Sequence, residues 1–99
     1  IVTAPQQLAT LDARRCIHLA AAMKIPVLGI VENMRGEVFG EGGGVRVAEM
    51  MRLPFLGSIP LRKQIVSLSD EGIPPVFHME ELEIIFGKIV RNALEKIAV

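Results

Sequence analysis

The sequence predicts an α/β fold in which helices flank a parallel β-sheet. Along its 99 residues, three short apolar runs lack polar alternation, as is typical of strands buried on both faces. Segments with an apolar residue at every third or fourth position separate these runs and indicate amphipathic helices. Because a helix between two strands makes a crossover connection, this order of elements favours a parallel sheet.

The first strand and the first helix are predicted at the start of the chain. Residues 1–3 are β-branched, which favours a strand, and Pro5 suits the first turn of a helix. A helix is expected over residues 6–24, and Pro26 ends it because the residue before a proline is displaced from the α region. Its sheet-facing side is expected to consist of Ala9, Ala13, Cys16, Ala20 and Met23.

The second and third strands are predicted on either side of a glycine-rich segment. The apolar run at residues 27–31 predicts one strand, and residues 54–59 predict the next, which Pro60 closes. Between them we expect a glycine-rich loop at residues 36–44 and a short helix over residues 45–52.

Two further helices are predicted after the third strand. Residues 61–71 predict a short helix with Gly72 as its C-terminal cap. Residues 79–98 predict an amphipathic helix whose first turn carries glutamates, where the helix dipole favours negative charge. Its apolar stripe consists of Leu82, Ile85, Phe86, Ile89, Val90, Ala93, Leu94 and Ile97.

Composition excludes several classes of protein. Hydrophobic residues make up 51% of the chain and 11 basic residues balance 11 acidic ones, which argues against disorder. Without a basic excess, tyrosine or tryptophan, the chain is not expected to bind nucleic acid. A single cysteine excludes an internal disulfide and indicates a reducing, cytoplasmic location. The longest apolar stretch, residues 25–31, is much shorter than the roughly 20 residues that span a bilayer, so no membrane partner is expected.

The start of the chain and the size of the sheet suggest a longer protein. The chain opens at Ile1 in an apolar run, with neither a charged leader nor a small-residue cleavage site. Three parallel strands also need cover on both faces and both edges. We therefore expect this chain to be the tail of a larger polypeptide.

Phosphate-binding chemistry is the first possibility to test in such a fold. The Gly-x-x-x-x-Gly-Lys-Ser/Thr pattern is absent, since the Gly87–Lys88 pair lies inside the last predicted helix. The glycines of residues 40–44 leave two interpretations open. Their backbone amides could bind an anion, or, as we favour, they form a flexible connection that needs positive φ angles.

No catalytic residue and no metal site is predicted. Cys16 and His18 stand two apart on a helix and therefore point in different directions. His78 precedes the last helix and is expected at the surface or in a cap, and Ser58 lacks the context of a nucleophile elbow. The ends of the second and third strands are better candidates, because ligands of open α/β sheets bind beyond the carboxyl ends of strands. Asn33 stands there, and its carboxamide could pair with a purine edge or simply form a turn.

Several sequence blocks in a fixed order resemble the C-terminal part of the Mrp/ApbC proteins. The blocks are Val2–Gln6, Asp12–Arg14, Val27–Met34, Phe39–Gly44, Pro54–Leu61 and Asp70–Pro74. The Mrp/ApbC proteins are deviant-P-loop ATPases, related to the MinD and ParA group, that carry iron–sulfur clusters to client proteins. The resemblance implies a partial P-loop NTPase (Rossmann-like) fold with its N-terminal half absent. Residues 1–99 would then be the C-terminal portion of one domain, with residues 1–76 family-like and residues 79–98 forming a C-terminal amphipathic helix.

The resemblance also implies a nucleotide site and a partner. Asn33 would hydrogen-bond the adenine of ATP, and the turn that contains Pro60 and Leu61 would pack near it. Pro5, Gln6 and Asp12 would lie towards the nucleotide and the face where two subunits form a homodimer. The ligands of the phosphates and of Mg²⁺ would belong to the absent half, and phosphoryl transfer needs them, so this chain alone is expected to be inactive.

One departure from the family concerns the iron–sulfur cluster. Cluster-binding members have a Cys-x-x-Cys between the Asn-Met and Phe-Gly-x-Gly-Gly-Gly blocks, where only residues 35–38 stand here. Clusters are held by thiolates, and Cys16 is placed on a helix elsewhere. Cluster binding in the family manner is therefore not expected of this chain.

Three functions remain open from the sequence. The leading hypothesis is the adenine-side portion of an Mrp-like ATP-binding protein that assembles or transfers iron–sulfur clusters to client proteins. The first alternative is a non-catalytic fragment that acts as a self-associating binding module. The second is a MinD/ParA-type positioning ATPase, whose membrane-binding version would need a basic C-terminal helix. The last helix is instead slightly acidic, which disfavours membrane binding.

Overall fold

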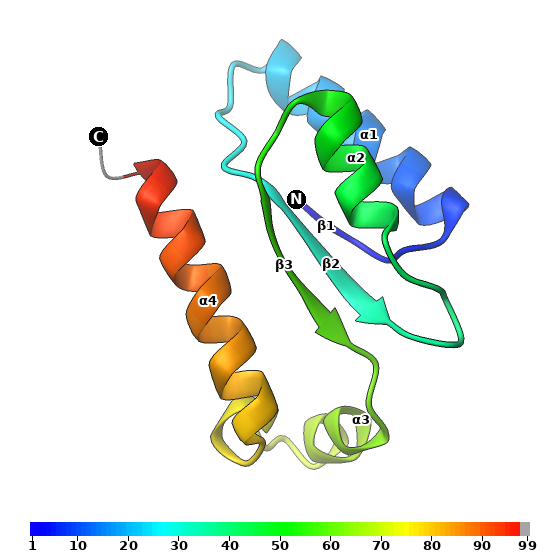
Figure 1. The fold of residues 1–99 in the computed structure, drawn as a ribbon, viewed down its shortest axis with the longest axis vertical. Coiled ribbons are helices and arrows are strands. Elements are labelled where there is room, and N and C mark those ends of the chain that lie inside the picture. Colours follow the sequence, from blue (N-terminus) through cyan, green and yellow to red (C-terminus); the bar gives the residue numbers. More distant parts are fainter. Residues whose placement is uncertain (98–99) are drawn as a thin grey trace.

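A computed structural model, which describes residues 1–97, shows a three-stranded parallel sheet with helices on both faces (Figure 1). The sheet has the order β1-β2-β3. In chain order the elements are β1 (Val2–Thr3), α1 (Gln7–Ala22), β2 (Ile30–Arg35), α2 (Gly43–Met51), β3 (Phe55–Pro60), α3 (Lys63–Asp70), the 3₁₀ turn η1 (Pro75–Phe77) and α4 (Glu80–Ile97). The α/β fold predicted from the sequence is confirmed.

The helices form two layers around the sheet. Helices α1 and α2 pack together against one face, whereas α4 lies along β3 on the other (Figure 1). Each layer has its own apolar cluster. Ile17, Ile30, Val47 and Ala48 form the cluster under α1 and α2. The cluster under α4 consists of Ile59, Met79 and Leu82.

The second strand lies later in the chain than predicted. It was expected at residues 27–31, but β2 runs from Ile30 to Arg35. The N–H of Ile30 donates to the carbonyl of Pro54 at 2.9 Å, and pairing cannot extend further back because Pro54 has no N–H. At its other end β2 continues because the N–H of Leu61 donates to the carbonyl of Arg35 at 2.9 Å. Asn33 therefore lies inside β2 rather than after it.

The first helix is shorter than predicted and presents a different face to the core. Helix α1 covers Gln7–Ala22 instead of residues 6–24, because Lys24 takes the left-handed conformation at φ 58° and ends it. Ala13 is buried as expected, together with Ile17, which the predicted face did not include. The assignment of Cys16 and Met23 to that face is wrong, since both are exposed.

The last helix uses only part of its predicted apolar stripe. Within α4, Leu82 is buried, and Ile85 and Ile89 pack against the cluster beneath it. The outer members of the stripe, Phe86, Val90, Leu94 and Ile97, are exposed. The predicted helix extended to residue 98, and residues 98–99 lie outside the described part of the chain. Gly72 has φ +75°, in keeping with its predicted role as a helix stop after α3.

Candidate functional site at the carboxyl edge of the sheet

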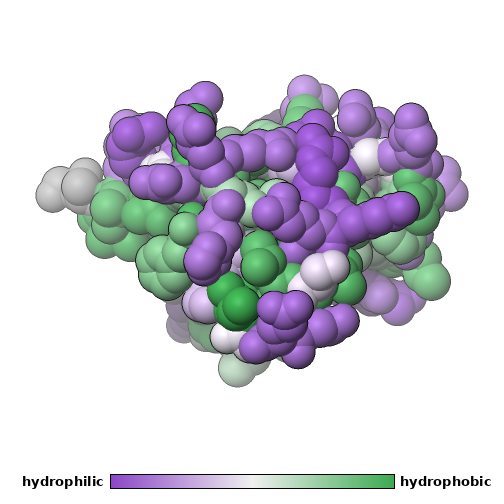
Figure 2. Space-filling view, turned by 90° about the horizontal axis from the view of Figure 1, so that it is seen from below, coloured by the Kyte–Doolittle hydropathy of each residue, from purple (hydrophilic) through white to green (hydrophobic). Residues whose placement is uncertain are grey.

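Three connections meet where the parallel strands end. Residues 4–6 follow β1, residues 36–42 follow β2, and residues 61–62 follow β3, all at the lower edge of the sheet in Figure 1. Figure 2 looks onto this edge from below, and hydrophilic residues cover much of it. Hydrophobic residues gather on the side of α4, at the left of this view. Ligands of open α/β sheets bind at such an edge.

A cavity of about 400 Å³ opens at this edge on the α4 side of the sheet. Its volume falls within the roughly 300–1,000 Å³ that is usual for small-molecule sites. Apolar side chains from four elements form its walls, and Asn33 and Ser69 contribute the polar groups. The lining residues are Asn33, Ile59, Ile65, Ser69, Pro75, Val76, Leu82 and Phe86. An apolar slot with a single carboxamide suits a flat heterocycle that carries hydrogen-bonding atoms at its rim.

The orientation of the Asn33 carboxamide follows from a contact with the next residue. Its Oδ1 accepts a hydrogen bond of 2.9 Å from the N–H of Met34, and only the oxygen of a carboxamide can accept. Met34 stands at φ 61°, in the left-handed region, where the strand bulges. With the oxygen held by the backbone, the NH₂ group of Asn33 remains as the donor that can serve a ligand.

Glu32, which the sequence analysis did not select as a candidate, organises the opposite side of the same strand end. Its side chain is 2% exposed, and Oε1 accepts a hydrogen bond of 2.7 Å from the N–H of Gly44. Oε2 accepts a second one, of 3.3 Å, from the N–H of Gly42. A buried carboxylate requires such partners. The signal available in the sequence was a glutamate directly after the apolar run of residues 27–31.

These bonds decide between the two interpretations of the glycine-rich loop. The amides of Gly42 and Gly44 donate to the protein's own carboxylate, so they do not form an open anion site. Gly40 and Gly42 have φ angles of +91° and +86°, as the interpretation of a connection with positive φ angles predicted. The expected start of the helix at residue 45 is corrected to Gly43, because the carboxylate satisfies the first amides of α2.

The other predicted site residues are distributed around the edge. Pro60 is buried and pairs with Arg35, whereas Leu61 lines a second cavity of about 520 Å³ on the side of the glycine-rich loop. Pro5 is buried beneath the start of α2. Gln6 and Asp12 are exposed, and neither lines these two cavities. Asn33 and the end of β3 are thus brought together around the first cavity, while Gln6 and Asp12 are not.

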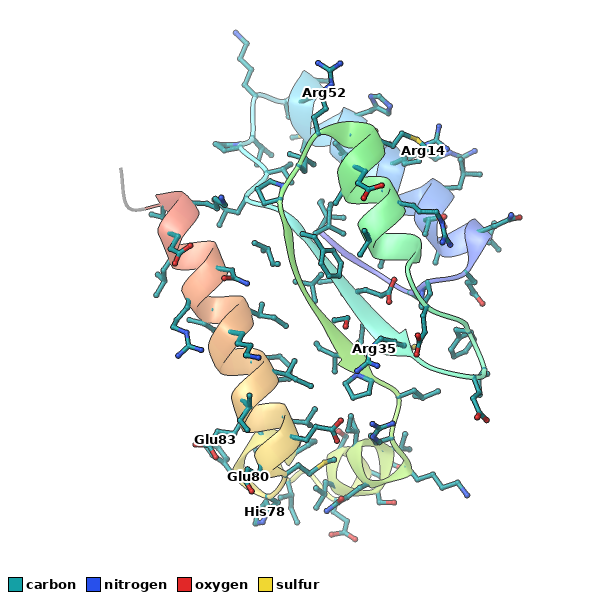
Figure 3. The ribbon with its side chains drawn as sticks, viewed as in Figure 1. Arg14, Arg35, Arg52, His78, Glu80 and Glu83 are labelled. Carbon is teal, nitrogen blue, oxygen red and sulfur yellow. The ribbon has the colours of Figure 1, made fainter. Side chains whose placement is uncertain are left out.

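Charged residues near the edge form no metal centre within residues 1–97. Figure 3 shows Arg35 at the carboxyl end of the sheet, and His78, Glu80 and Glu83 together at the start of α4. Among the described residues, no three His, Cys, Asp or Glu side chains are grouped so that they could hold a metal ion. Within the same range, none of the helices combines the length and apolar character needed to cross a membrane.

Comparison with known proteins places these features in context. The family model described as ParA, NUBPL iron-transfer P-loop NTPase, matches residues 1–98. The "Iron-sulfur cluster carrier protein" of Methanocaldococcus jannaschii is 37% identical over 98% of this chain and 37% of its own length. The "Probable cytosolic Fe-S cluster assembly factor" of Schizosaccharomyces japonicus is 34% identical over 98% of this chain and 18% of its own length. The "Iron-sulfur cluster carrier protein" of Pseudomonas fragi is 42% identical over 75% of this chain and 29% of its own length.

The chain spans 37% or less of the length of each of these relatives. The match with the M. jannaschii protein extends over 107 residues although this chain has only 99, so that relative contains additional residues within the matched region.

Proposed function

Because the chain belongs to the family of NUBPL iron-transfer P-loop NTPases, we propose that it forms the adenine-binding side of an ATP site in a protein that assembles or transfers iron–sulfur clusters. Membership confirms the resemblance to the ParA-related group that the sequence blocks indicated. The proposed cargo is supported by relatives named "Iron-sulfur cluster carrier protein" and "Probable cytosolic Fe-S cluster assembly factor". The compartment proposed for this chain is accordingly the cytoplasm.

A single observation carries the nucleotide proposal. Asn33 lines an apolar cavity formed by the ends of β2 and β3, α3, η1 and α4, and its Oδ1 already accepts from the N–H of Met34, which leaves its NH₂ group for a ligand. An adenine ring would bury its faces against the apolar walls and accept from the NH₂ group of Asn33 through N1. In guanine N1 carries a hydrogen and cannot accept, so this contact would favour AMP over GMP. Pro60 is buried directly after Ile59 at the end of β3, and Ile59 lines the cavity.

The triphosphate is proposed to be bound outside residues 1–99. Residues 1–99 contain no Gly-x-x-x-x-Gly-Lys-Ser/Thr loop, and the described residues offer no cluster of carboxylates for Mg²⁺. We therefore place the phosphate and Mg²⁺ ligands in polypeptide outside residues 1–99. The chain by itself is expected to bind the base weakly and to hydrolyse no ATP.

The iron–sulfur cluster would be the cargo of this protein, and residues 1–99 do not supply the several thiolates that hold such a cluster. Iron–sulfur clusters are ordinarily held by several thiolates, whereas Cys16 is the single cysteine of this sequence and lies exposed on α1. Ligands for the cargo would have to come from outside residues 1–99, and no transfer step is assigned to this chain.

We also propose that the protein acts as a homodimer. The outer row of α4 supports this assembly, because Val90, Leu94 and Ile97 are 53%, 54% and 59% exposed on one helix. Exposed apolar rows of this kind mark interaction surfaces. Light scattering during size-exclusion chromatography should show a dimer for the chain and a monomer for the double variant Val90→Glu/Leu94→Lys. A monomer in both cases would refute this assembly.

The nucleotide proposal is tested by nuclear magnetic resonance on the ¹⁵N-labelled chain. Addition of AMP should shift the side-chain NH₂ resonance of Asn33 and the amides of Ile59 and Val76. ATP should bind no more than about threefold more tightly than AMP, since a further tenfold gain would require about 1.4 kcal/mol of contacts to the extra phosphates.

A matched pair of variants identifies the contact. Asn33→Asp removes the NH₂ donor at nearly constant size and should weaken AMP binding by about threefold to tenfold, the usual worth of one hydrogen bond. Gln64→Ala, an exposed position of α3 outside the cavity, should leave binding unchanged. Equal affinities of Asn33→Asp and the parent chain for AMP would refute the proposal.

A further inference from the structure

Glu32 stands next to Asn33 in β2 and has no part in the nucleotide contacts described above. We propose that Glu32 is a positioning residue, whose buried carboxylate ties the start of α2 to the strand ends and thereby directs the Asn33 carboxamide into the cavity. The inference rests on the proposed nucleotide site for its consequence, although its structural part concerns the ligand-free chain alone.

The carboxylate of Glu32 is buried at the start of α2. Glu32 is 2% exposed, and its two oxygens accept from the amides of Gly44 and Gly42 at 2.7 and 3.3 Å. These amides belong to the N-terminus of α2, where the helix dipole favours a negative charge. A buried carboxylate is costly without such partners, so the side chain and the helix start hold one another in place.

The start of α2 is closely packed against the strands. A side chain at Gly44 would meet the Cβ of Glu32 at 2.9 Å and the ring of Phe55 at 3.1 Å. A side chain at Gly43 would collide with the backbone carbonyl of Pro5. The start of α2 therefore contacts the ends of β1 and β2 and the beginning of β3 at the same time. Through Gly44, Glu32 fixes its strand relative to this junction.

Strand β2 links this junction to Asn33, which directly follows Glu32. Two irregularities interrupt the pairing of β2 with β3, one between Ile30 and Val31 and one between Glu32 and Arg35. Glu32 itself faces Thr3 of β1 and Ser58 of β3, and the next pair along β2 is at Arg35. Asn33 lies between these pairs, so its orientation follows from its chain neighbour Glu32 rather than from a partner on an adjacent strand. Successive strand residues point to opposite faces. An anchored Glu32 on the α2 side consequently directs Asn33 to the cavity on the α4 side.

The variant that tests this inference is Glu32→Gln, with Glu37→Gln as its control. The glutamine retains an oxygen for Gly44 but turns an NH₂ group towards the N–H of Gly42. Glu37 is exposed in the loop that follows the same strand. In the ligand-free chain, Glu32→Gln should increase the hydrogen-exchange rate of the Gly42 amide and shift the Asn33 side-chain NH₂ resonance. Glu37→Gln should change neither.

Base selectivity separates positioning from stability. Loss of stability alone would weaken AMP and GMP binding by the same factor. If Asn33 is misdirected in Glu32→Gln, the preference of this variant for AMP over GMP should be lower than that of the parent chain by about threefold or more, because one hydrogen bond contributes about this factor to affinity. The Glu37→Gln control should keep the preference of the parent chain. An unchanged Asn33 resonance together with an unchanged AMP/GMP ratio in Glu32→Gln would overturn the inference.

Two results distinguish this inference from the proposed function. If the parent chain binds no AMP, the nucleotide site is refuted, while the Gly42 exchange rate and the Asn33 resonance still test the positioning role. If Glu32→Gln does not fold, the test uses the parent chain. There the Gly44 amide must exchange much more slowly than the amide of Glu37 in the exposed loop, and equal exchange rates would refute the anchoring by Glu32.

Discussion

The carboxamide nitrogen of Asn92 on α4 donates a hydrogen bond of 2.9 Å to the backbone carbonyl oxygen of Leu56 on β3. One helical turn earlier in α4, Ile89 lies directly over Gly57 of the same strand. The helix therefore covers the outer edge of β3 with a polar contact as well as an apolar one. An edge strand covered in this way is protected from pairing with other chains.

Removal of the Asn92 contact should destabilise the fold moderately. Asn92→Ala leaves the half-buried Leu56 carbonyl without this donor, and we expect a loss of about 1–2 kcal/mol in the free energy of unfolding. Urea denaturation measures the loss, with the neighbouring exposed Arg91→Ala as a control that should change stability by less than about 0.5 kcal/mol. A loss of equal size in both variants would contradict the role of this hydrogen bond.

Two glycines near α4 should respond to alanine in opposite directions. Gly57 has φ +154°, and a Cβ there would meet Cγ1 of Ile89 at 2.7 Å. Gly57→Ala should therefore cost about 2–4 kcal/mol from backbone strain and overpacking. Gly87, inside α4, has open space around it, so Gly87→Ala should stabilise by roughly 0.5–1 kcal/mol. Thermal unfolding would contradict this prediction if both variants shifted the midpoint in the same direction.

Truncation of leucines on α4 should distinguish its buried side from its exposed side. Leu82 is 2% exposed in the cluster with Ile59 and Met79, and Leu82→Ala should cost about 2–4 kcal/mol. Leu94 is 54% exposed, and in the monomer Leu94→Ala should cost less than about 1 kcal/mol. Denaturation at low protein concentration measures both values. A larger loss for Leu94 than for Leu82 would show that the helix packs through its other side.

The ion pair between α4 and the residue before α3 should contribute little. Nη2 of Arg62 lies 2.9 Å from Oε1 of Glu81, but the two side chains are 48% and 43% exposed. Water and salt screen such a pair, so a double-mutant cycle with Arg62→Ala and Glu81→Ala should give a coupling of at most about 1 kcal/mol. The coupling should fall further in about 0.5–1 M NaCl, because the Debye length there is only about 3–5 Å. A coupling that does not decrease with salt would contradict this assignment.

Much of the architecture could be predicted from local signals in the sequence. The unbroken apolar runs and the helical periods between them identified the sheet and the helices that flank it. The prediction was wrong where local signals do not decide the outcome. Residues 27–29 are as apolar as a strand, yet they lie outside β2 because Pro54 offers no N–H to pair with them.

The candidate site shows the same division. The residue type of Asn33 and its place near a strand end suggested a purine contact, and the structure puts it at a cavity. The role of Glu32 could not be read in this way, because its partners Gly42 and Gly44 lie 10 and 12 residues away and meet it only after the strand and helix have packed.

The sequence by itself determined which segments become strands and helices, because apolar periodicity, prolines and glycines act over a few neighbouring residues. Tertiary structure alone decided where β2 begins, which side of α4 is covered and which amides receive the Glu32 carboxylate. Those outcomes depend on contacts between distant segments, where hydrogen-bond partners and available space exist only once the layers are assembled.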